Sequence, residues 1–335
     1  MGIILRLSVI LLLGSCAMTS PRPERINGIS LVASRDSISV EDINPIVAVN
    51  ANYVAIMPFG FVRDLQHPQV IYNSDRQWFG ETKLGVKQYI EALQKQHIKI
   101  MMKPQIWVWR GEFTGLIKMK TEAEWQQLEQ SYSNFILEYA QVAQDTHTEL
   151  FCIGTELENF VGDRPEFWNQ LIAKIRTVYK GKLTYAANWN EFAKTPFWGQ
   201  LDYIGIDAYF PVSDKQTPTL QDCKDGWDSF KREIKEISED SKKPVLFTEF
   251  GYKSTDFAAM APWESNRETA NVNLEAQSNA IQALFDEFWD EDWFAGGFVW
   301  KWYRDHKKAG GENNARFTPQ NKPAEDIVRK YYGLN

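Results

Sequence analysis

Short apolar segments alternate with longer amphipathic segments along nearly the whole chain, and this alternation restricts the fold more than any other feature. Segments with the apolar character of buried strands lie at 28–33, 53–61, 98–109, 149–156, 183–189, 201–210, 244–250 and 294–302. Segments with apolar residues at helical spacing lie between or after them, at 82–96, 121–146, 164–179, 226–240, 274–289 and 323–333. The longest begins with Thr121 and Glu124 in the pattern of a capping box.

Eight predicted strands that alternate with helical segments, without a break in composition, predict a (β/α)₈ TIM barrel of the α/β class. The chain of 335 residues is long enough for one such barrel, and we expect a single domain at 26–335. A doubly wound sheet is the alternative. That fold would normally carry a Gly-rich phosphate loop after its first strand, and "SLVASRDSIS" contains no glycine.

The N-terminus has the features of an export signal. "MGIILRLSVILLLGSC" combines one arginine, a short apolar run and small residues, and "LGSC" resembles a bacterial lipoprotein cleavage box. We expect a signal peptide at 1–15, lipidation of Cys16 and a tether at 16–25, with an ordinary signal peptide as the alternative. The predicted location is the cell envelope, at the outer membrane if the source has two membranes. Cys152 and Cys223 imply no disulfide framework.

Composition points to a carbohydrate ligand. The net charge of -7 argues against nucleic acid as a partner, and we expect contact with a membrane only through the lipid anchor. The 13 Trp, 13 Tyr and 20 Phe are enough to supply flat surfaces for sugar rings as well as a core. The four histidines show no metal-ligand spacing, so no metal or cofactor is expected. A monomer is favoured, although the oligomeric state stays open.

Two glutamates stand where a barrel would place its chemistry, at the carboxyl ends of strands. Glu156 ends the fourth predicted strand and Glu249 lies near the end of the seventh. Two carboxyl groups about 5–5.5 Å apart are the geometry of a retaining glycosidase. Each could instead be a structural ion-pair partner. Glu158 competes with Glu156, because period-two alternation places both on one face if the strand continues that far.

Further polar and aromatic residues gather at the same strand ends. Candidate partners for sugar hydroxyls are Lys103, Asn159, Asn188 and Asp207. Candidate platforms for sugar rings are Trp107, Trp109, Trp189, Trp300 and Trp302. The alternatives are buried structural hydrogen bonds for the polar group and core or rim packing for the tryptophans.

Five segments carry a family resemblance: "CIGTELEN", "FWNQLIAKIR", "LTYAANWNE", "FWGQLDYIGIDAYFP" and "PVLFTEFGY". Together they resemble glycoside hydrolase family 113, a clan A family whose characterised members are β-1,4-mannanases. The resemblance runs from about residue 28 to about residue 332 and therefore covers nearly all of the predicted mature chain. It implies a retaining endo-β-1,4-mannanase acting on β-mannan or glucomannan.

The resemblance also implies roles for individual residues. Glu156 would be the acid/base, Glu249 the nucleophile, and Tyr209 the tyrosine that donates a hydrogen bond to the nucleophile. The chain departs from the family at Gln105, because related mannanases tend to have histidine where this chain reads "KPQ". Glutamine does not titrate, so this difference bears on substrate preference. An exo-acting β-mannosidase, another β-glycanase and a non-catalytic carbohydrate-binding lipoprotein stay open as alternatives.

Overall fold

Eight parallel strands close into a barrel in the computed structural model, which describes residues 24–264 and 271–334. The barrel order is β1-β10-β9-β8-β7-β6-β4-β2, and every neighbouring pair is parallel. The barrel strands are β1 (Ile26–Leu31), β2 (Tyr53–Ile56), β4 (Lys99–Met102), β6 (Leu150–Thr155), β7 (Lys182–Asn188), β8 (Ile204–Asp207), β9 (Val245–Phe250) and β10 (Phe294–Trp302). The predicted fold class is thus confirmed.

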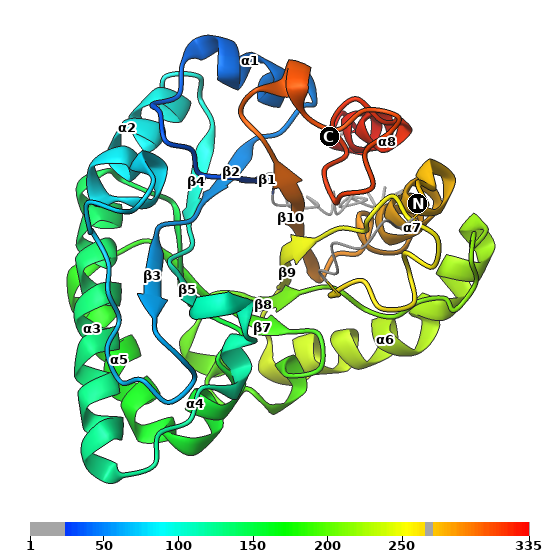
Figure 1. The fold of residues 1–335 in the computed structure, drawn as a ribbon. Helices are drawn as coiled ribbons and strands as arrows, with labels where there is room; N and C mark the ends of the chain where they lie inside the picture. The colour runs from blue at the N-terminus through cyan, green and yellow to red at the C-terminus, as the bar shows by residue number, and fades with distance from the viewer. Residues whose placement is uncertain (1–23, 265–270, 335) are drawn as a thin grey trace, which may run out of the picture.

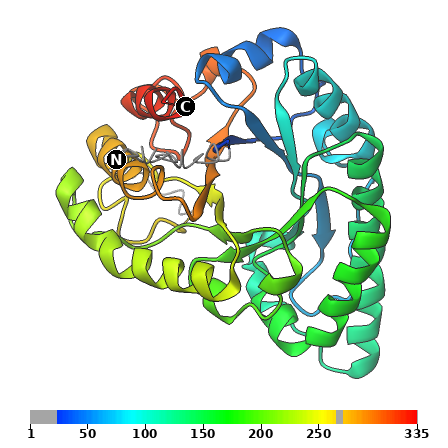
Figure 2. The same cartoon turned by 180° about the vertical axis from the view of Figure 1, so that it is seen from behind.

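Helices surround the strands on the outside, as the two opposite views show (Figures 1 and 2). They are α1 (Val40–Ala48), α2 (Lys83–Gln94), α3 (Glu122–Asp145), α4 (Glu158–Asp163), α5 (Pro165–Val178), α6 (Leu220–Ser241), α7 (Leu274–Phe288) and α8 (Pro323–Tyr332). The capping box is present at the start of α3, where the Thr121 hydroxyl and the Glu124 carboxylate bond to each other's backbone N–H. α6 begins at Leu220, earlier than the 226–240 segment predicted.

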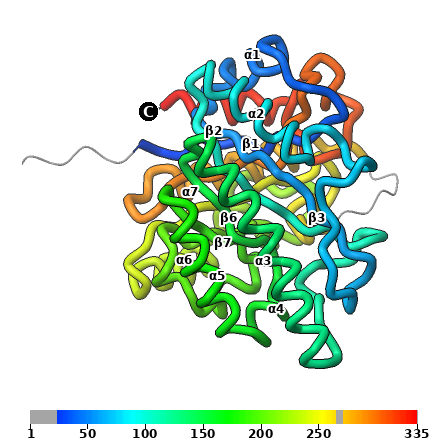
Figure 3. The backbone as a smooth tube through the Cα atoms, turned by 90° about the vertical axis from the view of Figure 1, so that its left-hand side faces the viewer, coloured from blue at the N-terminus to red at the C-terminus, as the bar shows by residue number. Residues whose placement is uncertain are grey.

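Two predicted strands are each divided by a proline. The segment 53–61 forms β2 and β3 (Phe59–Val62), and the segment 98–109 forms β4 and β5 (Gln105–Val108). Pro58 and Pro104 lie in the two gaps, where the missing N–H interrupts the ladder. β3 and β5 pair with each other as a separate two-stranded sheet. Figure 3 shows β3 beyond the end of β2.

Side chains from the strands fill the barrel, so it is a packed core and not a channel. Its interior cluster consists of Ile26, Ala55, Met101, Leu150, Cys152, Ala186, Leu246 and Phe298. Phe298 needs a glycine beside it, because a Cβ on Gly28 would lie 2.3 Å from the Phe298 ring. A second, larger cluster fills the space between the barrel and the helices. This packing leaves the strand ends as the place for polar side chains.

The predicted signal peptide, the predicted lipidation site at Cys16 and most of the predicted tether lie outside the described residues. No helix within residues 24–264 and 271–334 is both long and apolar enough to cross a membrane.

Candidate active site

Three donors from different parts of the barrel converge on the carboxylate of Glu249, which β9 carries. Lys103 Nζ lies 2.5 Å and Gln105 Nε2 3.0 Å from Oε1, and the Tyr209 hydroxyl lies 2.7 Å from Oε2. Glu249 is 6% exposed. Because these three groups donate and Glu249 accepts, the arrangement is that of an ionised, oriented carboxylate.

Lys103 and Asp207 form a buried ion cluster with Glu249. Lys103 Nζ donates to both oxygens of Asp207, at 3.0 and 3.1 Å, and Thr248 donates to Asp207 Oδ1 at 2.7 Å. Burial lowers the pKa of Lys103, but the charges of Asp207 and Glu249 outweigh it and the net shift is upward. Burial and the Glu249 charge raise the pKa of Asp207 to about 7, against the effect of Lys103.

The cluster changes the interpretation of two predicted sugar-binding residues. Lys103 is 0% and Asp207 1% exposed, so neither side chain reaches the surface. A sugar hydroxyl would have to displace one of the carboxylate bonds to reach Lys103. The geometry therefore assigns both residues to the support of Glu249 and not to direct contact with substrate.

Glu156 follows β6 directly and has a backbone conformation that few side chains adopt. Its φ of 50° lies in the left-handed region, and its N–H donates to the Ala186 carbonyl at 2.8 Å. Burial raises the pKa of Glu156 well above its ordinary value, and the charges of Asp207 and Glu249 raise it further, although Lys103 opposes them. Glu156 therefore holds its proton more tightly than a free glutamate does.

The structure separates Glu156 from its competitor, Glu158. β6 ends at Thr155, and Glu158 is the first residue of α4 instead of continuing the strand. Glu158 forms an ion pair with Lys194 at 3.2 Å. Asn159, a predicted sugar-binding residue, also lies in α4 and is partly buried.

Asn188 and Trp189, at the end of β7, are both partly buried. The Asn188 side-chain oxygen accepts a hydrogen bond from the Trp189 N–H at 2.8 Å, so this oxygen already has a partner within the chain. The Trp189 ring stacks on Trp263, with centroids 5.1 Å apart and planes at 21°. Trp263 is 44% exposed and was absent from the sequence prediction.

The other predicted aromatic platforms differ in exposure. Trp107 and Trp109, which follow the break at Pro104, are 50% and 66% exposed. Trp300 is partly buried, with Lys301 Nζ 5.1 Å from its ring centroid. Trp302 is 0% exposed and belongs to the core between barrel and helices. Its ring has no free face for a sugar, so the prediction for Trp302 does not fit its position.

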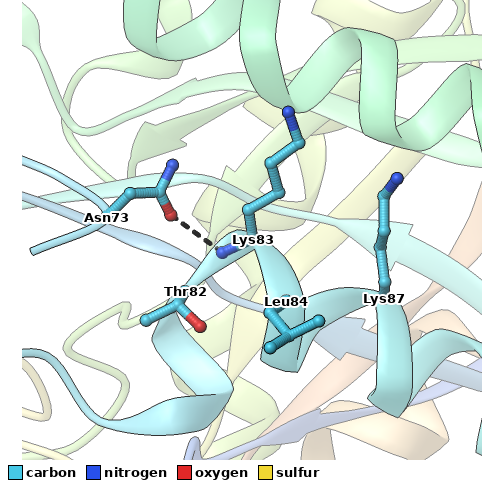
Figure 4. A pocket seen from close by; sticks show the side chains of 5 residues that line it. All are labelled: Asn73, Thr82, Lys83, Leu84 and Lys87. Carbon is cyan, nitrogen blue, oxygen red and sulfur yellow. Dashed lines mark hydrogen bonds between the residues drawn. The ribbon is translucent and has the colours of Figure 1, made fainter. Parts of the chain in front are cut away.

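Two surface pockets are lined by residues outside the cluster of Lys103, Asp207 and Glu249. One, of about 490 Å³, is lined by Asn73, Thr82, Lys83, Leu84 and Lys87 around the start of α2 (Figure 4). Another, of about 400 Å³, lies among α6, α7 and α8. Neither contains a predicted site residue. Among the described residues, no group of three His, Cys, Asp or Glu side chains is placed to hold a metal ion.

The sequence linked Gln105 to substrate preference and not to the Glu249 carboxylate, and Glu191 was not among the predicted site residues. The contact between Gln105 and Glu249 could have been predicted, because Gln105 lies two residues after Lys103, and the side chains of both residues reach the Glu249 carboxylate. Glu191 closes the segment "NWNE" after β7 and is 1% exposed. From the sequence alone, a glutamate in a polar segment after a strand is expected at the surface, and only the fold shows that Glu191 is buried.

Comparisons with known proteins identify the family and match the fold. Residues 34–322 match the model of Glycoside Hydrolase Family 113. The GH113 β-mannanase of Alicyclobacillus acidocaldarius is 25% identical, with a TM-score of 0.80 over 92% of this chain and 97% of that one. A GH113 β-1,4-mannanase is 22% identical, with a TM-score of 0.80 over 93% and 100%.

A more distant structure shares the barrel alone. The β-glucuronidase of Ruminococcus gnavus is 14% identical, with a TM-score of 0.62 over 93% of this chain and 50% of that one. No curated protein matched the sequence.

Proposed function

The chain belongs to glycoside hydrolase family 113 and is a glycoside hydrolase, and from this premise we propose that it is a retaining endo-β-1,4-mannanase. Its substrate would be β-mannan or glucomannan, attacked within the polymer. The chain is similar to enzymes described as a β-mannanase and a β-1,4-mannanase over nearly their full length. The exposed Trp107 and Trp109 give surfaces on which further sugar rings could stack.

One observation carries the proposed mechanism: Glu156 and Glu249 have opposite environments at the ends of two barrel strands. Three donors surround Glu249, which suits a carboxylate that must stay ionised to attack. The pKa of Glu156 is raised by burial and by neighbouring carboxylates, which suits a group that must keep its proton until the leaving oxygen takes it.

The reaction then proceeds by two displacements. Glu249 attacks the anomeric carbon while Glu156 gives its proton to the glycosidic oxygen, so one sugar–oxygen bond breaks and a glycosyl ester on Glu249 forms. Glu156, now ionised, takes a proton from water as that water attacks the same carbon. The ester bond to Glu249 breaks, and both carboxyl groups return to their starting states. Lys103 and Tyr209 hold Glu249 in place throughout.

Product analysis tests the substrate and the mode of action. The protein is incubated with mannan, glucomannan, cellulose and xylan, and the products are sized over time. We expect a spread of manno-oligosaccharides from the first two and little from the others. A single monosaccharide product would indicate exo action instead. Proton NMR of the first-formed anomer checks retention, and an inverted product would rule out the double displacement.

Variants of the two glutamates test their roles. Glu249→Gln should fold normally and lose turnover. Glu156→Ala should lose most activity on polysaccharide and least on aryl glycosides with good leaving groups, because these leave without a proton. Added azide should restore turnover of Glu156→Ala and give a β-glycosyl azide. Full activity of Glu249→Gln would overturn the assignment of the nucleophile.

We also propose, from the sequence alone, that Cys16 is lipidated and anchors the enzyme in the cell envelope. Expression in a bacterial host with an alkyne-labelled fatty acid checks this. The wild-type chain should carry label in the membrane fraction, and Cys16→Ser should carry none. An unlabelled wild-type chain released into the soluble fraction would indicate an ordinary signal peptide.

A further inference from the structure

Glu191 is a buried carboxyl group that the proposed mechanism does not use. It is 1% exposed and lies just after β7, on the segment that also carries Asn188. Its Oε1 accepts a hydrogen bond from the Tyr185 hydroxyl at 2.7 Å, and its Oε2 accepts one from the Asn188 N–H at 3.0 Å. Burial raises the pKa of Glu191 to about 7, although both hydrogen bonds act in the opposite direction.

The hydrogen bonds of Glu191 lead to the peptide group that follows Glu156. The Tyr185 hydroxyl, which donates to Glu191, accepts a hydrogen bond from the Leu157 N–H at 2.7 Å. Leu157 is the residue after Glu156. On the other side, the Glu156 N–H donates to the carbonyl of Ala186, the residue after Tyr185, at 2.8 Å. β7 thus holds the peptide groups on both sides of Glu156.

These two hydrogen bonds matter because the backbone conformation of Glu156 is unfavourable by itself. A non-glycine residue with a φ of 50° persists only where its surroundings fix it. The Thr114 hydroxyl adds a third contact, 3.2 Å from the Glu156 carbonyl oxygen. Among the described residues, the Glu156 carboxyl forms no hydrogen bond with another side chain or backbone group, so its direction depends on the backbone that carries it.

Glu191 also acts on Glu156 through charge. Glu156 faces Asp207 on β8, Glu249 on β9 and Lys103 after β4, and the charge of Glu191 adds to that of the two carboxylates in raising its pKa. Glu191 in turn faces Asp207 and Glu158, the latter on α4 and paired with Lys194. Glu191 therefore affects Glu156 in two ways. Its charge raises the pKa of Glu156, and its hydrogen bond to Tyr185 fixes the hydroxyl that holds the Leu157 N–H.

We propose that Glu191 is a positioning residue for Glu156, which it holds in place through the Tyr185 hydroxyl and the Leu157 N–H. This inference rests on the proposed role of Glu156 as acid/base. It adds Glu191 to the carboxyl groups of Glu156, Asp207 and Glu249 as a fourth, one that touches neither substrate nor reacting atoms.

The test compares kinetics of Glu191→Gln and wild type between pH 4 and pH 9. We expect kcat on mannan to fall at least about tenfold with KM changed less than about twofold, because positioning of the acid affects the transition state. Above about pH 7, where wild-type Glu191 is ionised, the basic limb of the kcat/KM profile should move to lower pH, because loss of that charge lets Glu156 ionise more easily. The loss should shrink on aryl glycosides with good leaving groups.

Tyr185→Phe separates positioning from charge, and Tyr179→Phe is its matched control. The Tyr179 hydroxyl is also buried and donates to the Thr148 carbonyl at 2.7 Å, before the start of β6. Both variants should lose stability, but only Tyr185→Phe should lose kcat. Glu325→Gln is the control for burial, since Glu325 is 6% exposed and bonded to His306 away from the site. It should leave the pH profile unchanged.

The outcomes separate this inference from the function on which it rests. If Glu156→Ala loses activity but Glu191→Gln keeps the wild-type pH profile and leaving-group dependence, Glu191 is only structural and the inference is wrong. If Glu156→Ala stays fully active on mannan, the acid/base role on which this inference rests is wrong. If the wild type releases no products from mannan or glucomannan, the proposed function itself fails. Should Glu191→Gln not fold, Tyr185→Phe decides: an unchanged kcat would reject the positioning role.

Discussion

At the scale of single residues, the site depends on Lys103, a cation enclosed by the carboxylates of Asp207 and Glu249. Removal of one partner from a buried ion pair leaves an uncompensated charge, which costs more than the pair itself contributes. Lys103 is 0% exposed, so water cannot replace it without a rearrangement of the barrel mouth. The cluster is thus a means of fixing the Glu249 carboxylate.

Lys103→Met should therefore lose both stability and activity. We expect the free energy of unfolding to fall by about 3–5 kcal/mol, because Asp207 and Glu249 would be left as adjacent buried carboxylates. Urea denaturation followed by tryptophan fluorescence measures this loss. Turnover should fall too, since Glu249 would lose its shortest hydrogen bond, at 2.5 Å.

The double variant Lys103→Met, Asp207→Asn provides the control. Asparagine at 207 removes one of the two unpaired charges, so the double variant should be more stable than Lys103→Met alone. The role given to the cluster would be contradicted if the losses of unfolding free energy caused by Lys103→Met and by Asp207→Asn simply added in the double variant. It would also be contradicted if Lys103→Met were as stable as wild type.

The identity of the site residues was easier to predict than their roles. Lys103, Asp207 and Glu249 all stood out as polar residues at strand ends, where the fold brings them together. The sequence left open whether Lys103 and Asp207 are buried or reach a sugar, because this depends on how deep each side chain lies across the barrel. Glu191 was missed for the same reason, since the sequence does not show that its carboxylate is buried against the Tyr185 hydroxyl.

At the scale of elements, a buried lysine joins two segments that follow neighbouring strands. Lys322, immediately before α8, is 4% exposed. Its Nζ donates to the Ser254 hydroxyl at 2.9 Å and to the Arg316 carbonyl at 2.7 Å. Ser254 follows β9, and Arg316 lies between β10 and α8. Burial lowers the pKa of Lys322 to about 7.

This shift predicts a specific dependence of stability on pH. Between about pH 7 and about pH 10.5 the unfolded chain binds a proton at this lysine that the folded chain does not, so stability rises with pH by up to about 1.4 kcal/mol per unit. Lys322→Met should lack this contribution, and the difference in unfolding free energy between it and wild type should change with pH across that window. Lys308→Met, at a side chain 85% exposed, should show no such change. A pH-independent difference for Lys322→Met would contradict the assignment.

Long amphipathic elements were predictable and interrupted ones were not. α3 and α7 match their predicted segments closely, because apolar residues recur at helical spacing over many turns. α1 was not among the predicted helical segments, because Pro45 within it weakens the helical pattern. The split of β4 from β5 was missed although Pro104 marks it.

At the scale of the whole molecule, the barrel depends on one seam, where the first strand meets the last. β1 and β10 pair in parallel, with Ile26 opposite Gly296. Gly296 has a φ of 120°, a conformation that glycine alone adopts readily. A Cβ there would lie 2.2 Å from the Ile26 carbonyl oxygen, so a side chain would force the two strands apart.

Gly296→Ala should accordingly destabilise the entire barrel. Backbone strain and overpacking cost about 1–3 kcal/mol each, so we expect a loss of about 2–6 kcal/mol in the free energy of unfolding. Gly199→Ala is the matched control, because nothing lies within 4 Å of its Cβ position, and its unfolding midpoint should stay near that of wild type. β10 also carries Trp300, so activity should fall with stability in Gly296→Ala. An unfolding midpoint equal to wild type would mean that the seam does not limit barrel stability, and the closure would then be held by the remaining strand pairs.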